Sequence, residues 1–216
     1  MAELRMAVFA SGQGTNFQAL ADAAKQGRLE GASLELLVCD KPLAPVVERA
    51  RRAGIDLLLF QPKEYSSREA YEQEILEELQ RRGIELIVLA GYMRIITPVL
   101  VEPFYGRMIN VHPALLPAFP GVNGVRQALD YGVKVTGVTV HYVDGGMDSG
   151  PIIAQRAVEV QDGDTEATLA PRIHAAEQEL LPWVVGRIAA GAVALDGRQV
   201  AIKGMHAAAG TEEKQR

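Results

Sequence analysis

The stretch LRMAVFASGQGTNFQALADAAKQ, residues 4–26, decides the class of fold. Its first part, 4–10, is almost wholly apolar and predicts a buried β-strand, while 16–26 is amphipathic and predicts an α-helix. The residues between them, 11–16, form a short glycine-rich turn. A strand that leads through glycines directly into a helix is typical of a unit of a parallel α/β sheet.

The same alternation continues through the first hundred residues. Further strands are predicted at 34–39, 56–60 and 84–90, and further helices at 45–53 and 67–82. Ser67 can cap the last of these helices, and a proline lies near the first turn of the other. Four alternations of strand and helix imply parallel strands joined by right-handed crossovers, which is a doubly wound, Rossmann-like α/β fold.

The second half of the chain has a different pattern. Prolines at 103, 113, 117 and 120 predict an ordered loop around a short strand at 108–111. Two longer strands are predicted at 135–143 and 152–160, with the second antiparallel to the first. A helix over 165–190 follows, which Pro171 and Pro182 are expected to divide or bend, and then a hairpin around Asp196-Gly197.

These elements predict one domain over residues 1–203. Its sheet is expected to be mixed, mostly parallel, with an antiparallel C-terminal part. The remaining segment, 204–216, has few residues to bury and is expected to be a disordered tail.

The composition is that of a globular protein. Of 216 residues, 48% are hydrophobic and 23% are charged, which excludes a wholly disordered chain. The net charge of −5 argues against extended contact with nucleic acid or anionic lipid, although one small phosphate can still bind locally. No run approaches the ~18 apolar residues of a membrane span, and the first residues do not form a signal peptide. Cys39 is the single cysteine, which fits a reducing compartment, and we expect a cytoplasmic protein.

The glycine-rich turn SGQGTN predicts a phosphate site. Glycines let the backbone approach a ligand, and the N-terminus of a helix offers unpaired N–H groups and a partial positive charge. The turn lacks the Gly-Lys-Ser/Thr of a P-loop, and Phe17 stands where a dinucleotide fingerprint needs its third glycine. The alternative is a tight strand-to-helix turn that binds no ligand.

Two further segments place polar side chains beside predicted strands. In NVHP, Asn110 and His112 lie two residues apart and point the same way on an extended segment, so an amide and an imidazole would converge on one oxyanion. The loop DGGMDSGP holds Asp144 and Asp148, and a carboxylate from it would orient His112 and favour the imidazolium. Ordinary loop residues and a simple hairpin turn are the alternatives.

The histidines do not predict a metal site. They stand at 112, 141, 174 and 206, without the spacing of zinc ligands and without a second cysteine, so no metal is expected. His141 alternates with Val140 and Tyr142 in a predicted strand and is interpreted as structural. His206 is interpreted as solvated.

Four segments in order resemble one family. SGQGTNFQAL from residue 11, LAGYMRIITPVLV from 89, INVHPALLPAFPG from 109 and GVTVHYVDGGMDSGPIIAQ from 137 are similar to segments of the phosphoribosylglycinamide formyltransferases, folate-dependent enzymes of purine synthesis. The resemblance runs from Met6 to about Arg187. The chain departs from the family at VCDK, 38–41, where S-N-K is usual, and it lacks a histidine that many relatives carry after Gly121.

The resemblance implies transfer of a formyl group from 10-formyltetrahydrofolate to the amine of phosphoribosylglycinamide, without a metal. By position it implies that Asn110, His112 and Asp148 are catalytic. The implied substrate contacts are Gly14, Thr15 and Asn16 at the phosphate and Glu177 at the ribose. The implied folate contacts are Arg68, Met93, Arg94, Ile95, Ile96, Asn110 and Asp144.

Other functions remain open from the sequence. A formyltetrahydrofolate deformylase is expected to carry an additional N-terminal domain, and a methionyl-tRNA formyltransferase a basic C-terminal domain, so both fit this chain poorly. A nicotinamide-nucleotide-binding module could use the glycine turn, with Asp40 as a ribose contact, but Phe17 argues against it. Small molecules are the expected partners, and a homodimer is left open.

Overall fold

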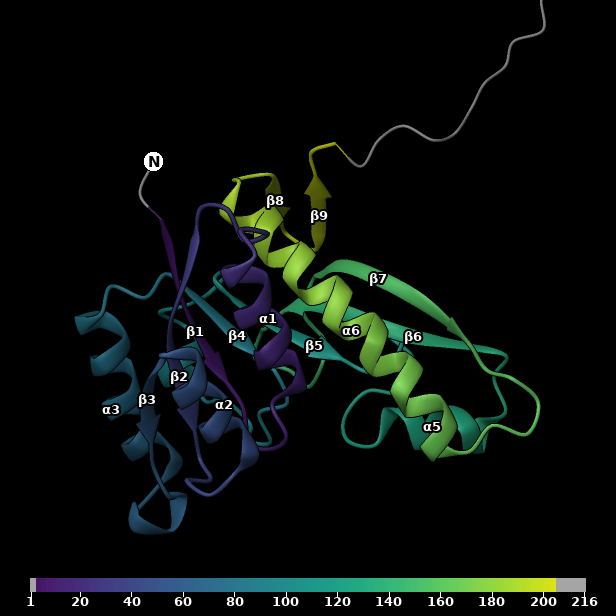
Figure 1. Ribbon diagram of the computed structural model, residues 1–216, viewed down its shortest axis with the longest axis horizontal. Helices are drawn as coiled ribbons and strands as arrows, with labels where there is room; N and C mark the ends of the chain where they lie inside the picture. The colour runs from purple at the N-terminus through teal and green to yellow at the C-terminus, as the bar shows by residue number, and fades with distance from the viewer. Residues whose placement is uncertain (1–2, 205–216) are drawn as a thin grey trace, which may run out of the picture.

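The computed structural model describes residues 3–204, which form a seven-stranded sheet with helices on both faces and a separate hairpin (Figure 1). The strands of the large sheet are β1 (Leu4–Phe9), β2 (Ala32–Cys39), β3 (Asp56–Leu59), β4 (Leu86–Leu89), β5 (Met108–His112), β6 (Val135–Tyr142) and β7 (Ile152–Glu159). Their order is β3-β2-β1-β4-β5-β6-β7. The first five are parallel, whereas β6 is antiparallel to both β5 and β7. The predicted doubly wound, mostly parallel sheet with an antiparallel C-terminal part is therefore confirmed.

The helices divide between the two faces of the sheet. They are α1 (Thr15–Lys25), α2 (Pro45–Ala53), α3 (Arg68–Arg81), α4 (Pro98–Val101), α5 (Gly124–Tyr131) and α6 (Glu166–Ala189), with a 3₁₀ turn at Pro62–Glu64. In Figure 1, α1, α2 and α6 cover the face toward the viewer. Alternate side chains of β1 explain how both faces become buried, since Met6 and Val8 join the core with α1 and α6, while Ala7 and Phe9 join the core with α3.

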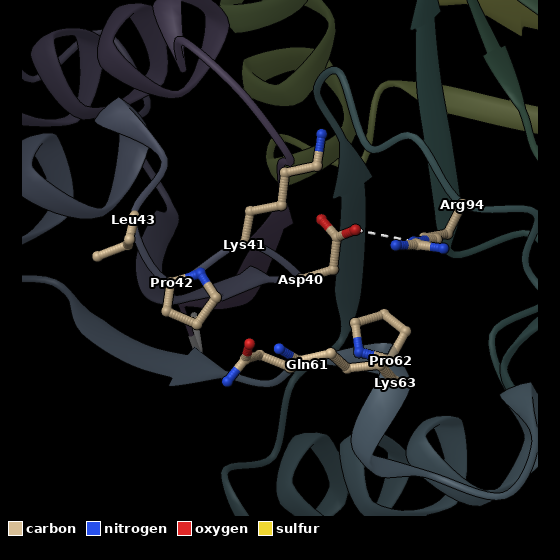
Figure 2. A pocket seen from close by; sticks show the side chains of 8 residues that line it. All are labelled: Asp40, Lys41, Pro42, Leu43, Gln61, Pro62, Lys63 and Arg94. Atoms are coloured by element: carbon tan, nitrogen blue, oxygen red, sulfur yellow. Dashed lines mark hydrogen bonds and ion pairs between the residues drawn. The ribbon is translucent and has the colours of Figure 1, made fainter.

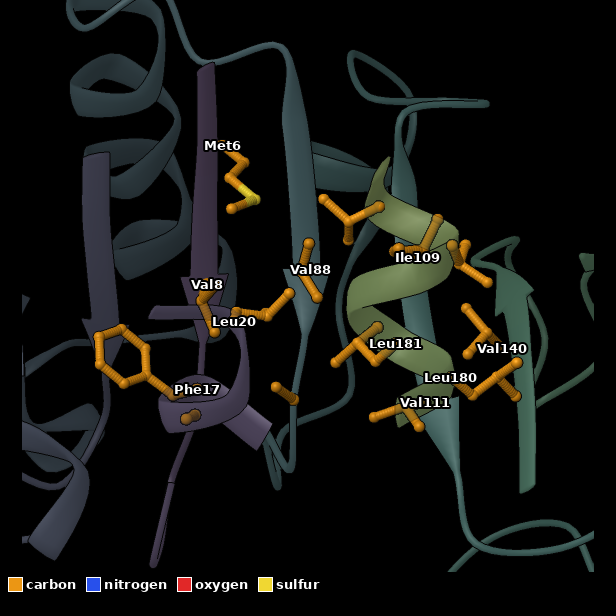
Figure 3. Packing of buried hydrophobic residues seen from close by; sticks show 14 of the residues in the cluster. Met6, Val8, Phe17, Leu20, Val88, Ile109, Val111, Val140, Leu180 and Leu181 are labelled. Carbon is orange, nitrogen blue, oxygen red and sulfur yellow. The ribbon is translucent and has the colours of Figure 1, made fainter. Parts of the chain in front are cut away.

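The larger core is continuous from α1 to α6. Figure 3 shows Phe17 and Leu20 of α1 beside Val8, and Leu181 of α6 projecting toward the neighbouring strands. Phe17, the residue that breaks the dinucleotide fingerprint, is fully buried. Its ring therefore fills space between helix and sheet that a glycine at this position would leave empty.

Local signals at the helix ends agree with the sequence. Ser67 caps α3 by accepting a hydrogen bond from the Ala70 N–H at 3.2 Å, and Pro45 occupies the first turn of α2. The predicted hairpin is present as β8 (Val193–Asp196) and β9 (Gln199–Ile202).

Of the predicted division or bending of the last long helix by its prolines, division is wrong and bending stays a prediction. Helix α6 runs without interruption from Glu166 to Ala189 although it contains Pro171 and Pro182. Each proline removes one backbone donor, but Leu180, Leu181 and Val184 are buried on both sides of Pro182. Packing of this apolar face against the sheet outweighs the lost hydrogen bonds.

The strand order identifies the edge of the sheet at which a ligand is expected to bind. The chain proceeds outward from β1 to β3 and then returns to place β4 on the other side of β1, so the direction of winding changes between β1 and β4. In doubly wound folds, ligands bind at the carboxyl ends of the strands at this point. Here the Ser11 N–H donates to the Gly91 carbonyl at 3.1 Å, which ties the two loops together.

Two predictions about the chain's extent are not decided by this fold. The proposal of one domain over 1–203 stays a prediction. Of the predicted disordered tail, 204–216, all but Gly204 lies outside the described residues, as does His206.

Candidate active site

The glycine turn is shaped for close approach of a ligand to the backbone. Gly14 is the N-cap of α1 with φ of 71°, in the left-handed region that favours glycine. A Cβ atom at this position would lie 2.4 Å from Val46 Cγ2, so α2 also excludes a side chain here. The first N–H groups of α1, which begins at Thr15, lack intrahelical acceptors and face the carboxyl edge of the sheet. This geometry agrees with the predicted phosphate site at Gly14, Thr15 and Asn16.

Asn16 and Glu177 meet across 161 residues of sequence. The Asn16 amide Nδ2 donates to Glu177 Oε2 at 3.0 Å, and both residues are buried. Burial raises the pKa of Glu177, although the hydrogen bond from Asn16 and the charge of His174 oppose this shift. The structure thus places the residue predicted for the ribose beside the residues predicted for the phosphate.

Arg49 supports the glycine turn and was not predicted as a site residue. Its Nε donates to the Gln13 carbonyl at 2.8 Å, and a terminal nitrogen lies 3.4 Å from Gln18 Oε1. The hydrogen bond fixes the peptide that precedes Gly14 and places a positive charge beside the turn. The sequence offers no local signal for this role, because Arg49 lies among several arginines of α2.

Asn110, His112 and Asp148 converge, as predicted. Asp148 Oδ1 lies 3.5 Å from Asn110 Nδ2, and Asp148 Oδ2 lies 3.4 Å from His112 Nδ1. Both partners come from β5, whose alternate residues point the same way. Asp148 has φ of 49°, an uncommon conformation for a residue other than glycine, and its Oδ2 accepts the Gly121 N–H at 2.7 Å.

The surroundings of Asp148 favour its charged form. Burial alone would raise the pKa of Asp148, but the neighbouring His141 imidazole, the hydrogen bond from the Gly121 N–H and the charge of His112 outweigh burial and lower it. Asp148 is therefore a carboxylate throughout the neutral range, as the predicted pairing with His112 requires.

Both ring nitrogens of His112 face acceptors. Nε2 lies 2.8 Å from the Phe119 carbonyl and is assigned as a donor, while Nδ1 faces Asp148. An imidazolium satisfies both acceptors at once, whereas a neutral ring can donate to only one of them. His112 is buried, and its neighbours Asn110 and Asp148 line the adjoining cavity.

His141 is part of this cluster, so its interpretation as only a strand residue was incomplete. It pairs with Asn110 in the antiparallel register of β5 and β6, and its Nε2 lies 3.1 Å from Asn110 Nδ2. Its Nδ1 faces the Tyr142 carbonyl at 2.8 Å, which assigns the proton to Nδ1 and makes Nε2 the acceptor of the Asn110 amide. His141 Nε2 is also 3.7 Å from Asp148 Oδ1.

A cavity of about 310 Å³ opens beside the cluster. Its walls come from the loop after β4 and the loop 143–148, and they include Asn110, His141 and Asp148. Of the predicted folate contacts, those in the wall are Arg94, Ile95, Ile96, Asn110 and Asp144. Arg68, exposed in the first turn of α3, and Met93, whose N–H donates to Ser11 Oγ at 2.9 Å, lie outside this wall.

Asp144 holds the loop 143–148 in shape. Its Oδ1 accepts hydrogen bonds from the Gly146 N–H at 3.0 Å and from Ser149 Oγ at 2.7 Å. Met147 in the same loop is 65% exposed. The loop therefore presents a largely exposed apolar side chain in the cavity wall, while the Asp144 carboxylate holds its backbone in place.

Within residues 3–204, no three side chains of His, Cys, Asp or Glu gather as a metal site. No helix in the same part of the chain is long and apolar enough to cross a membrane.

The fold and the site together define the class of protein, since a family model described as formyl transferase matches residues 4–185. The phosphoribosylglycinamide formyltransferase of Bacillus subtilis (strain 168) is 50% identical over 184 residues, which cover 85% of this chain and 94% of that protein. The chain belongs to the phosphoribosylglycinamide formyltransferase family, and membership implies a folate-derived formyl donor as co-substrate.

Solved structures agree with this family. The crystal structure of glycinamide ribonucleotide transformylase 1 from Symbiobacterium toebii is 44% identical with a TM-score of 0.90, covering 93% of this chain and 94% of that one. The protein of the same description from Geobacillus kaustophilus is 53% identical with a TM-score of 0.84, covering 87% of this chain and 99% of that one.

Proposed function

We propose that the protein transfers the formyl group of 10-formyltetrahydrofolate to the amine of 5-phosphoribosylglycinamide. The products are formylglycinamide ribonucleotide and tetrahydrofolate, in de novo purine biosynthesis. The observation that carries the proposal is the convergence of Asn110, His112 and Asp148 beside the 310 Å³ cavity. The glycine turn opens at the same edge of the sheet, so a phosphorylated acceptor and a formyl donor would meet at this cluster.

In the proposed reaction the neutral amine attacks directly. Its lone pair forms the new bond to the formyl carbon, and the electrons of the C=O bond move onto oxygen. No serine or cysteine nucleophile is needed, because the amine is itself nucleophilic. The new oxyanion requires donors, and a well-placed donor lowers such a barrier by roughly 3–4 kcal/mol. The Asn110 amide, in the cavity wall, supplies the first donor.

Protonated His112 supplies the second donor and the proton for the leaving group. Its 3.4 Å separation from Asp148 Oδ2 exceeds the about 2.7–2.9 Å of a tight charge-assisted hydrogen bond, so Nδ1–H is not held tightly by the carboxylate and is left for an incoming oxyanion. As the carbonyl reforms, the bond to the folate nitrogen breaks, and that nitrogen takes the Nδ1 proton. The surplus proton of the former amine then returns the imidazole to its charged form, while Asp148 stays ionised.

The acceptor is proposed to bind through its phosphate and its ribose. The N-terminus of α1 offers backbone donors to the phosphate. Glu177 would accept a ribose hydroxyl, and this contact would offset part of the cost of its burial. A substrate without the phosphate should therefore lose heavily in kcat/KM, and equal turnover of both forms would contradict the phosphate site.

One assay tests the proposal directly. Loss of formyl from 10-formyltetrahydrofolate should require phosphoribosylglycinamide and should yield one formylated product per folate released. Equal loss without the amine would indicate a deformylase, and fluorescence transfer to bound NADH without formyl transfer would indicate a nicotinamide-binding module. We expect activity to survive exhaustive chelation, so inactivation by a chelator that zinc reverses would contradict a metal-free mechanism. A cytoplasmic location and a homodimer remain predictions.

A further inference from the structure

Side chains outside the catalytic cluster hold the loops around it. After β4, Arg94 Nε donates to the buried Asp40 Oδ2 at 2.8 Å, and Figure 2 shows the two side chains facing each other. The loop 113–123, between β5 and α5, contacts the cluster more directly. Its backbone bonds to two catalytic side chains, His112 and Asp148, so the supports of this loop bear on the reaction.

The first half of this loop is anchored to the sheet. Thr139 of β6 is buried, and its hydroxyl donates to the Ala114 carbonyl at 2.7 Å and accepts the Leu116 N–H at 3.0 Å. Gln155 of β7 donates to the Leu116 carbonyl at 2.9 Å. In the described part of the chain, no comparable bond to β6 or β7 holds the second half, 119–123.

The second half instead depends on Gln127 of α5. Its Nε2 donates to the Val122 carbonyl at 2.8 Å and to the Pro120 carbonyl at 3.3 Å. The Pro120 carbonyl and the Gly121 N–H belong to one planar peptide and point in opposite directions. An amide held on that carbonyl therefore directs the N–H away from the Gln127 side chain, and this N–H donates to Asp148 Oδ2 at 2.7 Å.

The backbone of this second half requires such a support. Phe119 and Asn123 have φ of 56° and 62°, in the left-handed region that is uncommon for residues other than glycine. These conformations persist only where the surrounding contacts hold them. Apart from the bonds to the catalytic side chains, the hydrogen bonds that residues 119–122 make within the described structure are the two from Gln127.

We propose that Gln127 is a positioning residue for the catalytic cluster. It holds the peptide before Gly121 so that the Gly121 N–H keeps the Asp148 carboxylate directed at His112. The inference rests on the proposed function, in which that carboxylate favours the charged imidazole. Gln127 carries no charge, and the titratable groups in contact here are His112, Asp148 and His141. A change at Gln127 therefore alters the pH dependence of the reaction only by moving these groups.

Gln127→Met tests this role, because methionine keeps the length of the side chain but donates no hydrogen bond. We expect kcat to fall about 10- to 100-fold, since a misplacement of about 1 Å can cost about 100-fold. The alkaline limb of the kcat–pH curve should move to lower pH, part of the way toward its position in Asp148→Asn. Gln73→Met is the matched control, because Gln73 is exposed on α3 and donates to Glu77 of the same helix, so its kcat–pH curve should be that of the wild type.

A double-variant cycle separates positioning from a general effect on the fold. Added to Asp148→Asn, Gln127→Met should lower kcat by about twofold or less, because residues that act as a unit are not additive. Loss of folded protein would lower kcat equally in both backgrounds, so equal losses would overturn the role. An unmoved alkaline limb or a wild-type kcat in Gln127→Met would overturn it as well. A wild-type protein that transfers no formyl group would instead contradict the proposed function.

Discussion

Replacing Gly14 with alanine tests whether the glycine turn is built for backbone contact. Its φ of 71° costs an L-residue about 1–2 kcal/mol. The new methyl group would also meet Val46 Cγ2 at 2.4 Å and Val46 Cβ at 2.5 Å, and such overpacking costs about 1–3 kcal/mol. Together these terms predict a loss of about 2–5 kcal/mol in the free energy of unfolding. Because α1 must shift to relieve the contact, KM for the phosphorylated substrate should rise as well.

Urea unfolding of Gly14→Ala, Val46→Ala and the double variant separates the two terms. Removing the Val46 methyl groups relieves the 2.4 Å contact with Cγ2 but leaves the 2.5 Å contact with Cβ and the backbone strain. The double variant should therefore recover only part of the overpacking loss of about 1–3 kcal/mol relative to additivity. Gly12→Ala is the control, since no atom lies within 4 Å of a Cβ at Gly12, and it should stay within about 0.5 kcal/mol of the wild type. Full additivity, or a Gly14→Ala variant as stable as Gly12→Ala, would refute the reasoning.

Three other substitutions each predict effects on substrate binding, on stability or on both. Burial raises the pKa of Glu177, so the charged side chain destabilises the fold once the pH rises above the ordinary carboxyl range. Glu177→Gln should therefore raise Tm at pH 7, and a lower Tm would contradict this. The same substitution should raise KM for the ribosyl substrate. Arg49→Met should raise the same KM severalfold by releasing the glycine turn, whereas Arg52→Met, which removes a 77% exposed side chain of the same helix, should not. Arg94→Ala should raise KM for the folate more than it lowers kcat. It should also lower the free energy of unfolding by about 1–3 kcal/mol, because the buried carboxylate of Asp40 loses its partner. Adding Asp40→Asn should recover most of that stability, as urea unfolding would show.

The parallel half of the fold could be predicted because its signals are local. The apolar run of β1, the glycines that follow it and the amphipathic α1 lie within residues 4–26. Ser67 likewise caps α3 through a neighbour three residues away. The continuity of α6 through Pro182 could not be predicted in this way, because the packing that preserves it comes from strands distant in the sequence.

In the site, too, contacts between residues close in sequence could be predicted, and contacts between distant residues could not. The pairing of Asn110 with His112 follows from two-residue spacing on one strand. The place of His141 depends on the register between β5 and β6, which no local pattern encodes. The contact between Asn16 and Glu177 joins residues that lie 161 apart in the sequence, so for Glu177 the resemblance supplied what spacing could not.

The central claim is that Asp148 acts through His112 by keeping it protonated, and one set of kcat–pH curves tests it. The reaction needs a neutral amine and a charged imidazole, so the wild-type curve should be bell-shaped. Asp148→Asn keeps the shape of the side chain but removes the negative charge that lies 3.4 Å from His112 Nδ1 and favours a charged imidazole. The alkaline limb of the curve should then move to lower pH with a reduced kcat, and adding Asp148→Asn to His112→Ala should cost little more than His112→Ala alone. An alkaline limb that does not move, or losses that are fully additive, would mean that Asp148 only shapes its loop.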